Sequence, residues 1–229
     1  MIETITIIKK GEKQNMENRV YLYGLVVSNP KTCDDYYGSD YCNMDLSVQR
    51  LSGIVDTIPL TIHRKLIEKH EIKLGDNLAV LGEFRSYNKI ENNRSRLMLT
   101  MFVHEVTDDI DVANPNIIEL SGYICKLPVY RTTPFNREIA DLLIACNRSG
   151  NKSDYLPAIA WGRNARFAKN ITVGEQIHIS GRIQSREYQK RLDDGTVQTR
   201  TAYEISINQI DCENANAQNG DTNFILNNL

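Results

Sequence analysis

The 229-residue sequence has no apolar run approaching the roughly 20 residues that span a bilayer. Its first residues lack the apolar core and small-residue cleavage site of a secretory signal. It contains no C-x-x-C pair, and its four histidines do not cluster with its five cysteines. A disulfide framework and a zinc site are therefore not expected. We expect a cytoplasmic protein with free thiols, no membrane partner, no metal and no cofactor.

Motifs of catalysis are also missing. The chain has no glycine-rich phosphate loop of the Walker type, no H-E-x-x-H and no G-x-S-x-G. Its paired acids are Asp108-Asp109, in a linker, and Asp193-Asp194, in a turn. Acids at such positions usually serve as solvated turn formers. We expect no catalytic residues and no enzymatic activity.

Charge is unevenly distributed along the chain. The net charge is −2, yet residues 116–210 hold 13 basic and 9 acidic residues, a local excess of four positive charges. A basic surface of this kind can bind phosphate even on a chain that is acidic overall.

An internal repeat organises the sequence. Asn18–Gly24 resembles Asn116–Gly122 at an offset of 98 residues. Further matches follow in order, which indicates a tandem duplication joined by the acidic segment Thr107–Pro115. At the same offset the pairs are Pro30 and Pro128, Arg50 and Arg148, and Pro59 and Pro157; after one extra residue, they are Gly75 and Gly174, and Gly82 and Gly181.

Each copy has the pattern of five strands with a short helix after the third. This is the order of the OB-fold, so we predict an all-β chain of two tandem OB-fold five-stranded Greek-key barrels. The expected domains are residues 1–110 and 111–212, followed by an Asn-rich, disordered tail at 213–229. The expected strands are Val20–Val27, Met44–Arg50, Ile58–His63, Asn77–Ser86 and Leu97–Val106 in the first copy, and Ile117–Cys125, Asp141–Arg148, Leu156–Trp161, Gln176–Tyr188 and Thr199–Ile210 in the second; the helices are Lys65–Glu71 and Asn164–Lys169.

Five segments of the second copy, in order, follow a known pattern: a loop at Pro128–Pro134 and strands at Ala140–Arg148, Tyr155–Gly162, Gly174–Arg186 and Thr201–Ile205. Through them the second copy resembles the bacterial single-stranded DNA-binding protein family over almost its whole length. The resemblance implies binding of single-stranded DNA without strong sequence preference, in replication, repair or recombination, near the nucleoid. Two departures stand out: Phe135-Asn136 replaces a family glycine, and the tail lacks the family's acidic run with a Pro-Phe tip, which leaves recruitment of replication proteins open.

Single-stranded DNA binding needs aromatic faces for the bases and cations for the phosphates. Tyr155, Trp161 and Tyr188 fall where the resemblance places base-stacking aromatics, although a lone tryptophan can also fill a core. Alternation along one strand puts Arg182, Gln184, Arg186 and Tyr188 on one face, which is either a DNA groove or a solvated surface. Further expected contacts are Lys190 and Arg191 in the following hairpin, Arg148 and Lys152 beside the loop Asn147–Asp154, and Arg131 and Arg163.

The first copy differs at the same positions. Thr57 stands in place of Tyr155, and His63 in place of Trp161. Its loop Cys33–Cys42 carries three tyrosines but also three acids, which repel phosphate. We interpret this copy as a degenerate barrel with auxiliary binding around its later hairpin. Two alternatives remain open: a protein-interaction scaffold, and a primosome-type accessory protein with weak DNA binding.

The resemblance also implies four barrels per functional unit, hence a homodimer of two-barrel chains. The opening strand Val20–Val27 is apolar or aromatic on both faces, more than a barrel interior requires. The surplus face predicts a contact either with a second chain or with the other barrel of the same chain.

Overall fold

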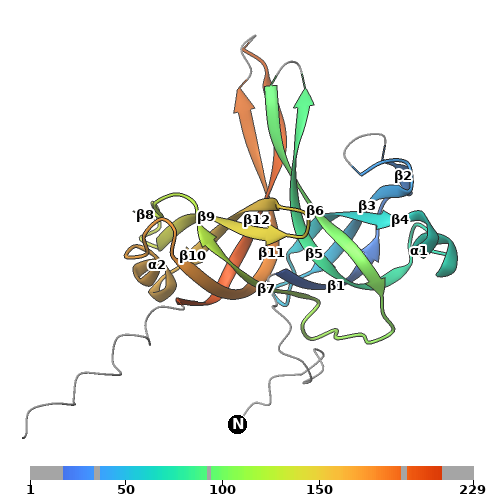
Figure 1. Ribbon diagram of the computed structural model, residues 1–229, viewed down its shortest axis with the longest axis horizontal. Helices are drawn as coiled ribbons and strands as arrows, with labels where there is room; N and C mark the ends of the chain where they lie inside the picture. The colour runs from blue at the N-terminus through green and yellow to red at the C-terminus, as the bar shows by residue number, and fades with distance from the viewer. Residues whose placement is uncertain (1–17, 34–36, 92–93, 192–194, 213–229) are drawn as a thin grey trace, which may run out of the picture.

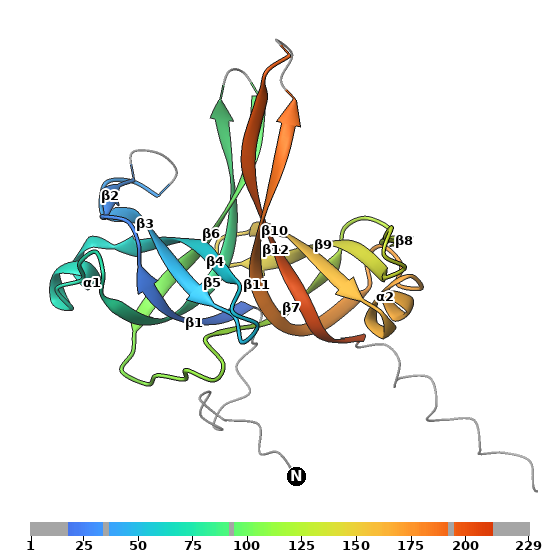
Figure 2. The ribbon, with the colours of Figure 1, turned by 180° about the vertical axis from the view of Figure 1, so that it is seen from behind.

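Two β-barrels lie side by side, and one long hairpin rises from each on the same side of the molecule (Figures 1 and 2). The computed structural model describes residues 18–33, 37–91, 94–191 and 195–212. The first barrel spans Asn18–Val106 and the second Asn116–Cys212, with residues 107–115 between them. The expected tail at 213–229 lies outside the described residues.

Each barrel is a five-stranded sheet whose first strand closes onto its second long strand. In the first barrel the order is β3-β4-β6-β5-β1, closed by β1–β3; in the second it is β9-β10-β12-β11-β7, closed by β7–β9. The first barrel contains β1 (Asn18–Val26), β2 (Lys31–Thr32), β3 (Tyr41–Gln49), β4 (Val55–His63), α1 (Arg64–Lys69), β5 (Asn77–Glu91) and β6 (Arg94–Val106). The second contains β7 (Asn116–Ile124), β8 (Val129–Thr132), β9 (Glu138–Arg148), β10 (Lys152–Trp161), α2 (Arg163–Ala168), β11 (Gln176–Arg191) and β12 (Val197–Cys212).

The predicted all-β fold of two tandem OB barrels is confirmed, with every expected long strand and both helices present. Two short edge strands, β2 and β8, were not expected. Residues 128–134 were expected as a loop, but β8 pairs there with β9. Among the described residues, neither helix is long and apolar enough to cross a membrane.

The repeated residues have identifiable structural roles. The side-chain amide of Asn18 accepts from the Phe84 N–H at 3.0 Å and donates to the Phe84 carbonyl at 2.7 Å, and Asn116 makes the same pair of bonds with Ile183. A Cβ at Gly24 would lie 2.3 Å from the Ser47 carbonyl oxygen, so only glycine fits where β1 closes onto β3. The repeated motif therefore fixes the first strand of each barrel: its asparagine binds the long hairpin strand, and its glycine allows close approach to the second long strand.

Strands β1 and β7 join the two barrels by antiparallel pairing. Val20 lies opposite Ile118, and these two residues are equivalent in the repeat. Asn18 lies opposite Leu120, and Leu22 opposite Asn116, so the pairing is symmetric about that centre. The two copies thus meet as identical subunits do across a two-fold axis, within one chain.

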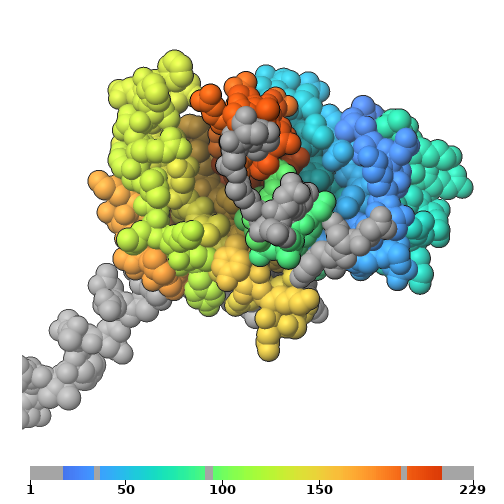
Figure 3. All heavy atoms as spheres, turned by 90° about the horizontal axis from the view of Figure 1, so that it is seen from above, coloured from blue at the N-terminus to red at the C-terminus, as the bar shows by residue number. Residues whose placement is uncertain are grey.

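A second pair of symmetric contacts crosses the junction. Asp56, at the start of β4, accepts a 2.7 Å hydrogen bond from the Ser185 N–H of the second barrel. Asp154, its equivalent in β10, accepts a 2.7 Å bond from the Ser86 N–H of the first barrel. Both aspartates are buried. Figure 3 shows the consequence: the β3–β4 turn lies against the hairpin of the second barrel, and the β9–β10 turn against the hairpin of the first.

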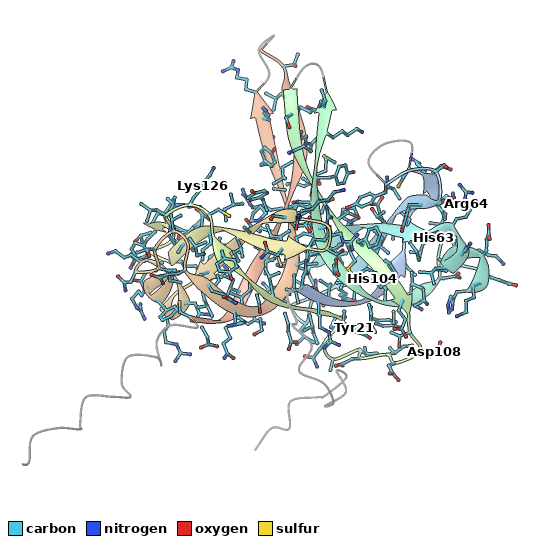
Figure 4. All side chains as sticks on the ribbon, in the orientation of Figure 1. Tyr21, His63, Arg64, His104, Asp108 and Lys126 are labelled. Atoms are coloured by element: carbon cyan, nitrogen blue, oxygen red, sulfur yellow. The ribbon has the colours of Figure 1, made fainter. Side chains whose placement is uncertain are left out.

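The segment 107–115 is bound to the underside of the first barrel. Tyr21, on the outer face of β1, is buried there, and its hydroxyl donates to the Asp109 carbonyl at 3.1 Å and accepts from the Asp111 N–H at 2.8 Å (Figure 4). The Asp111 carboxylate in turn accepts from the N–H groups of Ala113 and Asn114. The outer face of β1 is therefore covered within the chain at Tyr21, and the edge of β1 is paired with β7, whereas Leu25 farther along the same face is 42% exposed.

Candidate nucleic-acid interface

Three exposed aromatic side chains mark the outer surface of the second barrel. Tyr155 is 47% exposed, Trp161 39% and Tyr188 36%. Large aromatics are normally buried, so three exposed rings on β10 and β11 need an explanation. Trp161 does not fill the core, which settles the alternative left open by the sequence.

Strand alternation in β10 produces this exposure. Leu156, Ala158 and Ala160 point into the barrel and are buried. Tyr155 and Trp161 therefore point outward, on the same face. Six residues separate them, which places the two rings about 20 Å apart along the strand at 3.3 Å per residue. The rings can thus stack on different nucleotides of one strand.

The hairpin β11–β12 carries Tyr188 together with three exposed cations. Arg186, Tyr188 and Lys190 alternate along β11 and are exposed, and Arg191 follows at its end. Arg200 of β12 lies directly opposite Tyr188 and was not predicted. A cationic ribbon with an aromatic ring at its centre suits a single strand, whose phosphates and bases need both.

The other expected cations lie apart from the hairpin. Lys152 and Arg163 are exposed, at the start of β10 and of α2. Arg131 on β8 is also exposed, but its guanidinium forms an ion pair with Asp141 at 3.0 Å. An exposed pair of this kind contributes little energy and can exchange for a phosphate.

Three of the expected contacts lie at the barrel junction or are paired within the protein. Arg148 pairs with the buried Asp154 at 3.4 Å, at the barrel junction. Gln184 shares the predicted outer face but is only 8% exposed, and its amide donates to Glu204 at 2.8 Å. Arg182 lines a cavity between the barrels. We therefore leave Arg148 and Gln184 out of the proposed interface, because their hydrogen-bonding groups are already used.

The corresponding face of the first barrel is covered by its own aromatic residues. Phe102 in β6 is buried, and the rings of Tyr37 and Tyr41 lie 5.1 and 5.2 Å from it. The Arg85 guanidinium lies 3.6 Å from the Phe102 ring centre. Burial raises the pKa of Tyr37 to about 12, although Arg85 and Arg148 act to lower it. Tyr37 thus covers one side of the Phe102 ring.

Register shows that the two faces are equivalent. Thr61 lies beside Phe102, and Ile159, its counterpart in the repeat, lies beside Ser206. The first barrel therefore has a bulky ring where the second has a small serine. The Tyr37 contact was missed because loop conformation is not encoded by periodicity; the run of tyrosines in 36–41 was the available signal.

Charged residues on this face of the first barrel are also paired. Glu83 lies 3.2 Å from His104 and 2.8 Å from Arg85. The hydrogen bond from His104 lowers the pKa of Glu83 to about 2, with help from Arg85 and against the effect of burial. Because Arg85 is already paired with Glu83, its guanidinium attracts a phosphate less strongly.

Comparison with known proteins agrees with the geometry. The model of the single-strand binding protein family matches residues 115–212, the whole of the second barrel. The second barrel is similar to the single-strand binding protein family. The match begins one residue before β7 and ends at the last residue of β12, so it includes all three exposed aromatics.

Known proteins named as single-stranded DNA-binding proteins match part of the chain. A single-stranded DNA-binding protein of Clostridium tetani is 33% identical over 88 residues, 35% of this chain and 59% of the relative. Single-stranded DNA-binding protein 1 of Staphylococcus aureus is 30% identical over 83 residues, 33% of this chain and 50% of the relative. The chain thus spans between half and three fifths of the length of these relatives.

A solved structure resembles the whole two-barrel arrangement. The wild-type single-stranded DNA binding protein from Thermus aquaticus superposes with a TM-score of 0.64 at 16% identity, covering 85% of this chain and 92% of that one. A deletion mutant of the same protein gives a TM-score of 0.62. The coverage exceeds either barrel alone, so the shared fold includes both barrels.

Proposed function

We propose that this protein binds single-stranded DNA without strong sequence preference, through the outer face of its second barrel. The exposure of Tyr155, Trp161 and Tyr188 beside the cationic β11–β12 hairpin carries the proposal. Base stacking on an aromatic ring contributes about 1–3 kcal/mol per base and tolerates every base. The relatives' names, which describe single-stranded DNA binding, support the same function.

The second barrel is the principal binding surface in this proposal. Its rings are exposed, whereas Phe102 in the first barrel lies under Tyr37. The first barrel then serves mainly to complete the junction, with Tyr87 and Lys89 on its hairpin as auxiliary contacts. Three exposed rings favour DNA binding over a scaffold or a primosome-type accessory role, for which exposed stacking surfaces are unnecessary.

The biological role proposed is non-enzymatic. The protein covers single strands exposed in replication, repair or recombination, in the cytoplasm and in contact with the nucleoid. No chemical step is required of any residue in the interface, because stacking and phosphate contacts are sufficient for binding.

Preference for single strands is the direct test. A fluorescently labelled oligo-dT should bind with a rise in anisotropy, and unlabelled oligo-dT should compete at least about 100-fold better than a dA·dT duplex of equal length. The reason is that a duplex hides the base faces, so the stacking energy of two or more bases is lost. Equal competition by the duplex would show binding by charge alone and would refute the proposal.

For assembly, we propose a homodimer with four barrels in total. Residues 107–115 cover the outer face of β1 at Tyr21, so this part of the face no longer supplies a reason for dimerisation. On the outer face of the second barrel, Tyr123 is exposed on β7, and a cavity of about 490 Å³ lies between β7, β11 and β12. A two-fold contact through this open face would cover it.

Light scattering across micromolar concentrations measures the assembly. A mass near twice 26.1 kDa is expected for the dimer. As a control, Tyr123→Arg should shift the mass toward a single chain without changing the circular dichroism spectrum. A mass of one chain for the unmodified protein at every concentration would refute the dimer.

A further inference from the structure

A cavity of about 350 Å³ lies between the two barrels, beneath the β3–β4 turn. Its walls come from residues 48–52 of the first barrel, residues 113–116 at the end of the linker, and Arg182 and Asn208 of the second barrel. It is separate from the exposed rings, which lie farther along β10 and the β11–β12 hairpin. Both barrels and the linker between them therefore contribute residues to this cavity.

Arg182 brings an unneutralised positive charge to this cavity. Its Nε is buried and has no hydrogen-bond partner among the residues that the structure describes. Its Nη2 is 3.5 Å from Gln184 Oε1, at the outer limit of a hydrogen bond, and Gln184 is itself bonded to Glu204. Arginine stays protonated in proteins, and a buried donor atom without a partner is costly.

The carboxylate that attracts Arg182 already has other partners. Asp56 accepts two bonds from Arg50, at 2.6 and 2.7 Å, and a third from the Ser185 N–H. Burial lowers the pKa of Arg182 and Arg50 lowers it further by repulsion, whereas Asp56 acts to raise it. Two arginines thus share the charge of one carboxylate, and the cavity keeps an excess of positive charge.

The equivalent position in the first barrel does not carry this excess of positive charge. The counterpart of Arg182 in the repeat is Glu83, because Asn18 bonds to Phe84 as Asn116 bonds to Ile183. Glu83 is neutralised by Arg85 and His104. The same position is therefore charge-balanced in one barrel and left positive in the other.

We propose that Arg182, with Arg50 beside it, binds a phosphate group in the cavity between the barrels. A guanidinium presents its donors in a fork that matches phosphate oxygens. Gln49, Ser52 and Asn208 line the same cavity and can donate further hydrogen bonds. The phosphate is either free in solution or part of a DNA backbone; the second source rests on the proposed function.

Thermal unfolding tests the site without DNA. Phosphate should raise the Tm of the unmodified protein by about 3 °C over chloride at equal ionic strength and pH 7, because a ligand that binds only the folded state stabilises it. Arg182→Met keeps the aliphatic stem and should lose most of this rise. In chloride, Arg182→Met should unfold no earlier than the unmodified protein, since an unpaired buried charge has been removed.

Arg186→Met is the matched control, because Arg186 lies on the same strand but outside the cavity. It should retain the full phosphate effect, which separates binding from the general stabilisation that phosphate gives through exclusion from the surface. Oligo-dT binding, followed by Trp161 fluorescence, then identifies the source. A salt slope reduced by about 0.7 in Arg182→Met indicates a backbone phosphate, and an unchanged slope with a lost thermal effect indicates free phosphate.

An equal phosphate effect in all three proteins, with the same salt slope for Arg182→Met as for the unmodified protein, would overturn the site. That outcome would leave Trp161 quenching by oligo-dT unaffected, so the proposed function would stand. Conversely, loss of DNA binding with a retained Arg182-dependent thermal effect would contradict the function and not the site.

Discussion

Replacing Tyr155 and Tyr188 together by alanine is expected to weaken oligo-dT binding by roughly 2–6 kcal/mol, because each ring stacks on a base. Both rings are exposed, so their removal leaves the barrel core unchanged. Fluorescence anisotropy at low salt measures the affinity, and circular dichroism verifies the fold. The expected result is a loss of affinity with no loss of stability.

Thr57→Ala is the matched control, since Thr57 is exposed on β4 at the position equivalent to Tyr155. It should leave binding almost unchanged. A double variant that binds as tightly as the unmodified protein would show that the second barrel is not the stacking surface. If Thr57→Ala alone weakened oligo-dT binding, the interface would instead lie on the first barrel.

Asp56→Ala is expected to reduce the free energy of unfolding by about 3–5 kcal/mol, the cost of removing one partner from a buried ion pair. Asp56 is 0% exposed and bonds both Arg50 and the Ser185 N–H. Its pKa reflects the balance: burial acts to raise it, but the bonds from Arg50 and Ser185 prevail and lower it. Urea unfolding measures the loss.

Asp141→Ala provides the comparison, because Asp141 pairs with Arg131 at the surface. Its loss should cost at most about 1 kcal/mol. If both substitutions cost the same, the contact between Asp56 and Ser185 does not hold the barrels together, and the junction depends on the β1–β7 pairing alone.

The duplication, the strand order and the outward parity of the aromatics could be predicted from local patterns. Alternation in residues 155–161 places Tyr155 and Trp161 on one face, and the structure confirms that both are exposed. The repeat even contained the junction: Asp56 and Asp154 are 98 residues apart, and Ser86 and Ser185 are 99 apart. Matching the two aspartates in the repeat would have allowed the contact between the two copies to be inferred.

The partners of charged residues could not be predicted in the same way. Arg148 has the sequence context of a DNA contact, but Asp154 lies across the β9–β10 hairpin and pairs with it. Gln184 has the predicted parity, yet Glu204 on the neighbouring strand accepts its amide proton. Parity specifies the face of a strand, whereas burial and pairing on that face depend on residues brought together only by the tertiary fold.

The emission of Trp161, the only tryptophan, during titration with oligo-dT at about 50 and 200 mM salt tests the central claim most directly. Stacking should quench the emission at both concentrations. If the five exposed cations Lys152, Arg163, Arg186, Lys190 and Arg191 contact phosphates, the affinity should fall roughly 100-fold between them, at about 0.7 counterions released per phosphate. An emission unchanged by oligo-dT, with no mobility shift at the lower salt, would contradict single-stranded DNA binding by this face.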